Sequence, residues 1–211
     1  MGLDMYIRKE TYLRNRCASD RGKWGEPTQK TRISCVGYWR KARNIHDWIC
    51  EKTGLLDAGG DTTPVDDDLL KELRDICRDI LKEFDGTLFK PSEKSLKTIR
   101  SLNARARRHN AKLAKGLLKE DAQPIQLLDI PKKFVFKFAD AKDIYWSHRF
   151  CNEFEVIEPS KKVRRLISEN IPCIGVLNSY YVDEILHTYL MLSEILRRWD
   201  ENAEYEYRFS S

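Results

Sequence analysis

The sequence predicts an α+β protein: an antiparallel sheet packed by amphipathic helices, with a basic helical insertion. Two observations lead to this fold class. Strand-like alternation of apolar and polar residues occurs at both ends of the chain, at residues 3–9 and 205–209. Between them, strands and helices come in runs rather than in strict strand–helix alternation, which favours a mostly antiparallel sheet. We therefore expect a single α+β domain over residues 1–211, in which residues 87–130 form an inserted basic helical region.

The first third of the chain predicts a strand at residues 3–9 and a second, short strand at 33–36. The residues between them (14–32) are polar, contain Gly and Pro, and predict a loop. Apolar residues at helical spacing then predict a helix over 38–52, stopped by Gly54.

The next helix is expected over residues 64–85. Thr63 is the expected N-cap, Pro64 the first helical residue, and the acidic residues 66–68 suit the positive end of the helix dipole. An i, i+3, i+4 rhythm of apolar residues follows. This pattern is typical of a packed amphipathic helix.

Five further elements are expected in the rest of the chain. Ser92 predicts the cap of a third helix, whose apolar stripe is thin, so most of its perimeter must face water or a polyanion. Extended segments are expected at 134–138 and 150–158. A long helix over 181–199 and a closing strand at 205–209 complete the fold.

The composition argues against a disordered, a membrane-spanning and a secreted protein. The 211 residues are 41% hydrophobic and 34% charged, and the aromatic content (10%) argues against disorder. No stretch approaches the ~18 apolar residues of a membrane span, and the opening residues lack the apolar core of a signal peptide. Six cysteines at no framework spacing are typical of reduced thiols. We expect a cytoplasmic protein without a membrane partner.

Positive charge is concentrated in one block. Residues 90–119 contain ten Lys or Arg and one acidic residue, Glu93, so this segment has a net charge of +9 within a chain of +5. Such a block is either a solvated helix or a surface that meets phosphate. The residues expected to contact backbone phosphates are Arg105, Arg107, Arg108, Lys112 and Lys115.

A second candidate phosphate site lies at the start of the 38–52 helix. Backbone amides, the helix dipole and cationic side chains together suit an anion. The residues concerned are Arg40, Lys41, Arg43 and His46. The alternative is that these charges are solvated or paired with acidic residues.

Tyr145 and Trp146 lie among cationic residues, a pattern typical of surfaces on which unpaired bases stack. The same composition is common in protein cores, and both interpretations stay open.

Motifs for catalysis and for cofactors are weak. The sequence has no CxxC, no HExxH, no Gly-x-Ser-x-Gly turn and no phosphate-cradling glycine loop. We expect no catalytic residues, no metal and no cofactor. An acid–base enzyme that uses His46 stays an alternative, because such sites assemble in space.

The opening MGLDMY and the block VGYWRKARNIHDWIC at residues 36–50 resemble an uncharacterised family of tailed bacteriophages, prophages and their bacterial hosts. The resemblance covers residues 1–85 and 171–211, about half the chain. Arg43 and Asn44 depart from the family pattern, and residues 87–170, with the whole basic block, have no counterpart in it. The resemblance implies a phage-associated protein in the host cytoplasm, and it supplies no activity.

These observations together predict a non-catalytic phage-type accessory protein, acting in host takeover or counter-defence. We expect it to bind phosphate-bearing partners, above all nucleic acid, through the basic helix. Three alternatives stay open: a protein that sequesters a small nucleotide signal, an inhibitor that binds a host protein, and an enzyme.

Overall fold

The computed structural model describes residues 3–13, 30–55, 62–117, 119, 121–140 and 153–210. These residues form two compact units. Unit 1 comprises residues 1–83, 162–175 and 184–211, and unit 2 comprises residues 84–161 and 176–183. Both units combine helices with antiparallel strands, so the predicted α+β class is confirmed.

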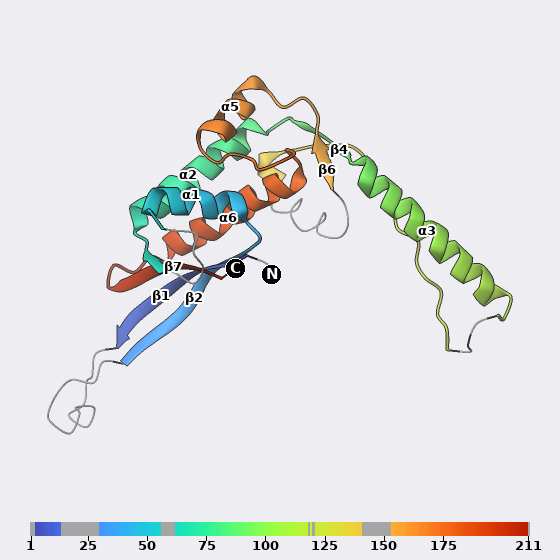
Figure 1. Cartoon of the computed structure of the whole chain (residues 1–211), viewed down its shortest axis with the longest axis horizontal. Helices are drawn as coiled ribbons and strands as arrows, with labels where there is room; N and C mark the ends of the chain where they lie inside the picture. Colours follow the sequence, from blue (N-terminus) through green and yellow to red (C-terminus); the bar gives the residue numbers. More distant parts are fainter. Residues whose placement is uncertain are drawn as a thin grey trace. The chain divides into compact units, whose positions relative to one another are not determined.

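Unit 1 contains a four-stranded antiparallel sheet in the order β2-β1-β7-β3 (Figure 1). Its strands are β1 (Asp4–Leu13), β2 (Lys30–Arg40), β7 (Ala203–Ser210) and β3 (Thr62–Pro64). The two ends of the chain are therefore neighbours, with Met5 opposite Phe209 and Ile7 opposite Tyr207. All four of these side chains are fully buried, as expected from the alternation at both termini.

Helices α1 (Arg43–Thr53), α2 (Asp67–Glu83) and most of α6 (Ser179–Arg197) belong to unit 1. Helix α5 (Lys161–Glu169) is also in this unit, apart from its first residue. The core between helices and sheet includes Trp39, whose Nε1 donates to Thr188 Oγ1 at 2.9 Å. A buried indole needs such a partner, because an unpaired N–H away from water costs about 1–3 kcal/mol.

Two predicted boundaries in unit 1 are wrong. The strand expected at 33–36 extends through Gly37 and Trp39 to Arg40, so α1 begins at Arg43 rather than near residue 38. A Cβ added at Gly37 would lie 3.1 Å from Ile195 Cδ1 and 3.2 Å from Met191 Sδ, both in α6. The glycine thus lies in the strand at a close approach of α6 side chains, which would have to shift to admit a Cβ, and not in a turn into α1.

The start of α2 also differs from the prediction. Thr63 and Pro64 belong to β3, which pairs with β7, and the helix begins at Asp67. Asp66 provides the cap instead, since its side chain accepts from the backbone N–H of Leu69 at 2.8 Å.

Unit 2 contains a three-stranded antiparallel sheet in the order β5-β4-β6. Its elements are β4 (Leu88–Pro91), α3 (Glu93–Ala114), β5 (Phe134–Val135), the 3-10 helix η2 (Phe138–Asp140) and β6 (Phe154–Val156). Phe84, Phe89, Phe136 and Phe154 are buried around this sheet. The central strands thus form a sheet of their own, whereas the sequence predicted one sheet with the terminal strands. The basic segment 87–130 lies wholly within unit 2.

Among the helices that the structure describes, none has the length and apolar character needed to cross a membrane.

Candidate nucleic-acid interface

The predicted basic helix is α3, and its beginning is set by local sequence. Ser92 is its N-cap, and the serine side chain accepts from the backbone N–H of Ser95 at 3.1 Å, as predicted. Glu93 in the first turn suits the helix dipole. The buried face of the helix is narrow and half polar: Ser95, Ile99, Asn103 and Ala106.

Two asparagines attach an extended segment, residues 121–130, to this face; we call the segment the strap. Asn103 exchanges two hydrogen bonds with the backbone N–H and C=O of Leu128, each at 2.8 Å. Asn110 does the same with Ile125, again with both distances at 2.8 Å. The asparagine amides thus pair with the strap as a neighbouring strand would. Figure 1 shows the strap beside α3.

The spacing of the two asparagines matches the strap. Seven residues along an α-helix rise about 10.5 Å, and three fully extended residues span about 10 Å. Asn103 and Asn110 are seven residues apart, and their partners Leu128 and Ile125 are three apart. Both asparagines can therefore bond the strap at once without distortion of the helix.

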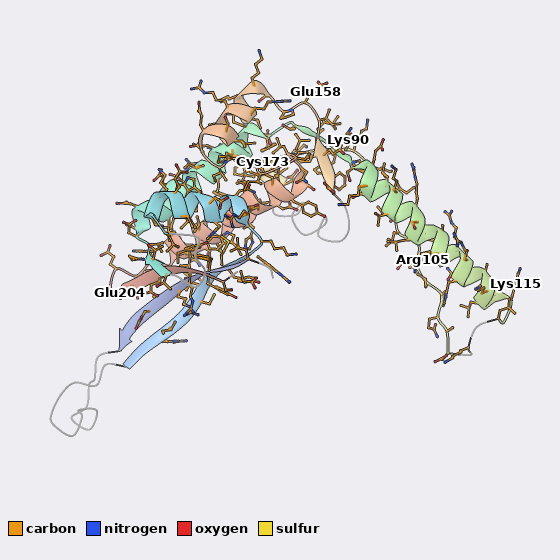
Figure 2. The ribbon with its side chains drawn as sticks, in the orientation of Figure 1. Lys90, Arg105, Lys115, Glu158, Cys173 and Glu204 are labelled. Carbon is orange, nitrogen blue, oxygen red and sulfur yellow. The ribbon has the colours of Figure 1, made fainter. Side chains whose placement is uncertain are left out.

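The opposite side of α3 carries a row of cations that we call the cationic ridge: Lys94, Lys97, Arg105, Arg108, Lys112 and Lys115. At about 100° per residue, all six project within a sector of about 80°, roughly 160° around the helix from the buried face. Ser101 occupies the position between Lys97 and Arg105. All seven residues are exposed. Figure 2 labels Arg105 and Lys115 on the helix.

The ridge is nearly free of carboxylates. Within the part of the chain that the structure describes, its one ion pair joins Lys97 to Glu93 at 3.9 Å, and both side chains are more than three-quarters exposed. Such an exposed pair contributes little.

In three helices of unit 1, by contrast, arginines pair closely with carboxylates of the same helix. In α1, Arg43 pairs with Asp47 at 2.7 Å, and in α2, Arg74 pairs with Asp75 at 2.7 Å. In α6, Arg197 pairs with Glu194 at 2.7 Å. In contrast to these pairs, five of the six ridge cations have no ion pair within the described residues.

Arg107 does not lie on the ridge. With Arg100 it forms a second, shorter row on one flank of α3, about 105° around the helix from the ridge. Both side chains are exposed. Of the five expected phosphate ligands, four lie in the ridge and one on the flank.

At the second candidate site, an internal carboxylate occupies the start of α1. Glu184 of α6 accepts from the backbone N–H of Ile45 at 3.1 Å and from Nδ2 of Asn44 at 2.8 Å. Asn44 Oδ1 in turn accepts from the backbone N–H of Ile174. Burial raises the pKa of the Glu184 carboxyl, and these hydrogen bonds only partly offset the effect. The backbone N–H of Ile45, one of the amides expected to bind phosphate, is therefore already hydrogen-bonded to Glu184.

The four side chains expected at this site have different surroundings. Arg40 ends β2 and Lys41 follows with a φ of 61°; both are exposed. Arg43 pairs with Asp47. His46 is fully buried, so we leave it out of the phosphate-binding surface proposed below.

His46 lies in a buried cluster instead. Its Nδ1 shares a hydrogen bond of 2.7 Å with the hydroxyl of Tyr207, and its ring lies 4.5 Å from that of Phe209. Cys50 Sγ is 3.5 Å from Nε2, one helical turn away. This arrangement is that of a hydrogen-bonded core histidine.

Two of the described cysteines have raised thiol pKa values. Cys77 is fully buried, and burial raises the pKa of its thiol far above the usual range, so the thiol stays protonated. Burial also raises the pKa of Cys173. The described residues include no group of three or more His, Cys, Asp and Glu side chains that could hold a metal ion. Tyr145 and Trp146, the expected stacking residues, lie outside the described residues.

Three clefts of about 340, 370 and 440 Å³ lie on unit 1. Trp199, stacked on Tyr205 with ring centroids 3.8 Å apart, lines two of them. Lys9 and Arg198 line the smallest, and each has a carboxylate partner: Asp200 and Glu194. None of the three is lined by the residues expected to bind a small nucleotide at the start of α1.

Comparison with known proteins adds no relative. No model of a protein family matches the chain, and neither curated proteins nor solved structures give a significant match. The resemblance to a phage family therefore stays a prediction.

Proposed function

We propose that the protein binds nucleic acid through the cationic ridge of α3, as a phage-type accessory protein without catalytic activity of its own. One observation carries the proposal: six cations lie along one side of a single helix, and only Lys97 among them has an ion pair within the described residues. Cations that neutralise phosphates release the counterions condensed on the polyanion, and this release drives binding.

The length of the ridge suits a polyanion rather than a single phosphate. From Lys94 to Lys115 the helix rises about 31 Å, with neighbouring ridge positions about 5 Å apart. One small anion can contact only two or three of these side chains. A nucleic-acid backbone can contact all six, and the alternative of a small sequestered nucleotide is correspondingly less well supported.

Arg40 and Lys41 remain in the proposal as an accessory patch on unit 1. Both are exposed and have no ion pair within the described residues, whereas Arg43 is partly neutralised by Asp47. We assign the main binding to the ridge.

The experiment compares two double charge reversals on the same helix. The ridge variant is Arg105→Glu with Arg108→Glu, and the control is Arg100→Glu with Arg107→Glu on the flank. Both change the net charge equally and replace the same residue type at exposed positions. Binding to a labelled 20-bp duplex is measured by fluorescence anisotropy at 0.1 M salt.

Each phosphate contact contributes about 0.9 log units at 0.1 M salt, so loss of two contacts weakens binding by about 60-fold or more. We expect this loss in the ridge variant and a much smaller one in the flank control. Equal losses would mean that net charge alone matters. Unchanged affinity in the ridge variant would refute the proposal.

A further inference from the structure

We infer that the ridge is fitted to the phosphate backbone of a duplex, and that it binds without regard to base sequence. This inference rests on the proposed function and names the class of nucleic acid. It depends on three features of α3: the straightness of the ridge, the attachment of the strap, and the residue types along the exposed surface.

The ridge is a straight line of charge on a preformed rod. Its length of about 31 Å is close to the 34–36 Å of one duplex turn. A duplex is stiff over about 150 bp and carries one charge per about 1.7 Å of axis. With both strands counted, a rigid row of cations therefore meets a dense and equally rigid array of phosphates. A single strand has a lower charge density and must be ordered first.

The strap keeps the helix formed before any ligand arrives. Asn103 and Asn110 hold the strap by four hydrogen bonds of 2.8 Å, all on the side away from the ridge. Contact between His109 and the carbonyl of Gln123 at 3.0 Å adds to this attachment. The ridge side chains thus share one rigid support, and binding requires little ordering of the backbone.

Residue types along the helix argue against the stacking of unpaired bases. From Glu93 to Leu117 the sequence contains no Phe, Tyr or Trp. Proteins that bind single strands combine a basic groove with aromatic side chains on which unpaired bases stack. The one ridge position without a cation is Ser101, which is exposed and small. The surface is therefore built for phosphates.

Counterion release gives the expected size of the preference. For six contacts, the slope of log K against log salt is about −5.4 on a duplex and about −4.2 on a single strand. At 0.1 M salt this difference corresponds to about 15-fold tighter binding of the duplex.

The test measures the affinity of the full chain for 20-mers at 0.1 M salt: two DNA duplexes of unrelated sequence, one RNA duplex, and one DNA single strand. We expect the DNA duplexes to bind equally and about 15-fold more tightly than the single strand. The RNA duplex also carries a dense array of phosphates, so its affinity shows whether the ridge distinguishes duplex RNA from duplex DNA. Equal or tighter binding of the single strand, or a tenfold difference between the DNA duplexes, would overturn the inference. Failure of all four ligands to bind would overturn the proposed function itself.

A second variant tests the part played by the strap. Asn103→Ala with Asn110→Ala removes the four hydrogen bonds and leaves every cation in place. We expect the duplex-to-single-strand ratio to fall toward one, because the helix is no longer held straight. A ratio that stays at its wild-type value would show that the strap does not contribute to the preference.

Discussion

Ser101 leaves a gap in the cationic ridge, and replacing it with arginine tests whether the ridge binds as a row. The side chain is exposed and lies between Lys97 and Arg105 in the line of cations. Arginine has a higher helix propensity than serine, so the substitution should not weaken α3. Ser101→Arg therefore adds a seventh cation to the ridge with little change elsewhere.

The size of the gain follows from one additional phosphate contact. That contact steepens the slope of log K against log salt by about 0.9, which corresponds to about eightfold tighter duplex binding at 0.1 M salt and about threefold at 0.3 M. The assay is fluorescence anisotropy with a labelled 20-bp duplex, titrated at both salt concentrations.

Ala114→Arg is the matched control for this gain. Ala114 is exposed on the same helix but lies about 140° around it from the ridge. We expect a much smaller gain there. An equal gain from both substitutions, or no gain from Ser101→Arg, would refute the reasoning that the ridge docks as one line.

Three further predictions concern stability. Asn103→Ala removes two hydrogen bonds to Leu128 from a buried position, which should cost about 1–3 kcal/mol and speed hydrogen exchange of the Leu128 amide. Glu184→Gln should remove a pH-dependent loss of stability. Burial raises the pKa of the folded carboxyl above 4.5, so the folded state binds the proton more tightly than the unfolded state. The wild type should lose unfolding free energy relative to the Gln variant as the pH rises from 4.5 through this raised pKa, measured by urea denaturation. Gly37→Ala should lower the melting temperature and cost about 1–3 kcal/mol, because the new Cβ would lie 3.2 Å from Met191 Sδ.

Each of these has a clear contrary result. Unchanged exchange at Leu128 would mean that the asparagine does not hold the strap in solution. A difference between wild type and Glu184→Gln that is constant with pH would contradict the raised pKa. A melting temperature unchanged by Gly37→Ala would show that α6 can move away from the strand.

The sequence predicted best the elements that carry their own signals. Helix α3 begins after Ser92 as expected, and the apolar spacing over 181–199 corresponds to α6. Gly54 adopts a φ of 70° at the end of α1, as a left-handed stop requires. In each case the signal lies within a few residues of the element.

Errors arose where distant residues decide. Thr63 and Pro64 have the local chemistry of a helix start, but pairing with β7, some 140 residues later, places them in a strand. In the first turn of α1, the backbone N–H of Ile45 donates to Glu184, which is 139 residues away in the sequence and has no signal near α1. The division of the strands into two sheets depends on pairings across the chain in the same way.

The ridge was within reach of the sequence. Its cations follow one another at intervals of three, four and, across Ser101, eight residues, the spacing of one helical face, but counting net charge alone does not reveal that alignment. The strap was not predictable in this way. Extended residues without alternation give no periodic signal, and their partners are asparagine side chains.

The seven-to-three match between α3 and the strap makes the pair a repeatable unit. Seven helical residues and three strap residues cover the same length, about 10 Å, and seven helical residues include two ridge positions. Adding one unit to both partners would lengthen the row of cations and keep every asparagine opposite a backbone amide and carbonyl. A single inserted residue in either partner would break that alignment. The length of the row of cations is therefore set in steps of about 10 Å, each adding two ridge positions.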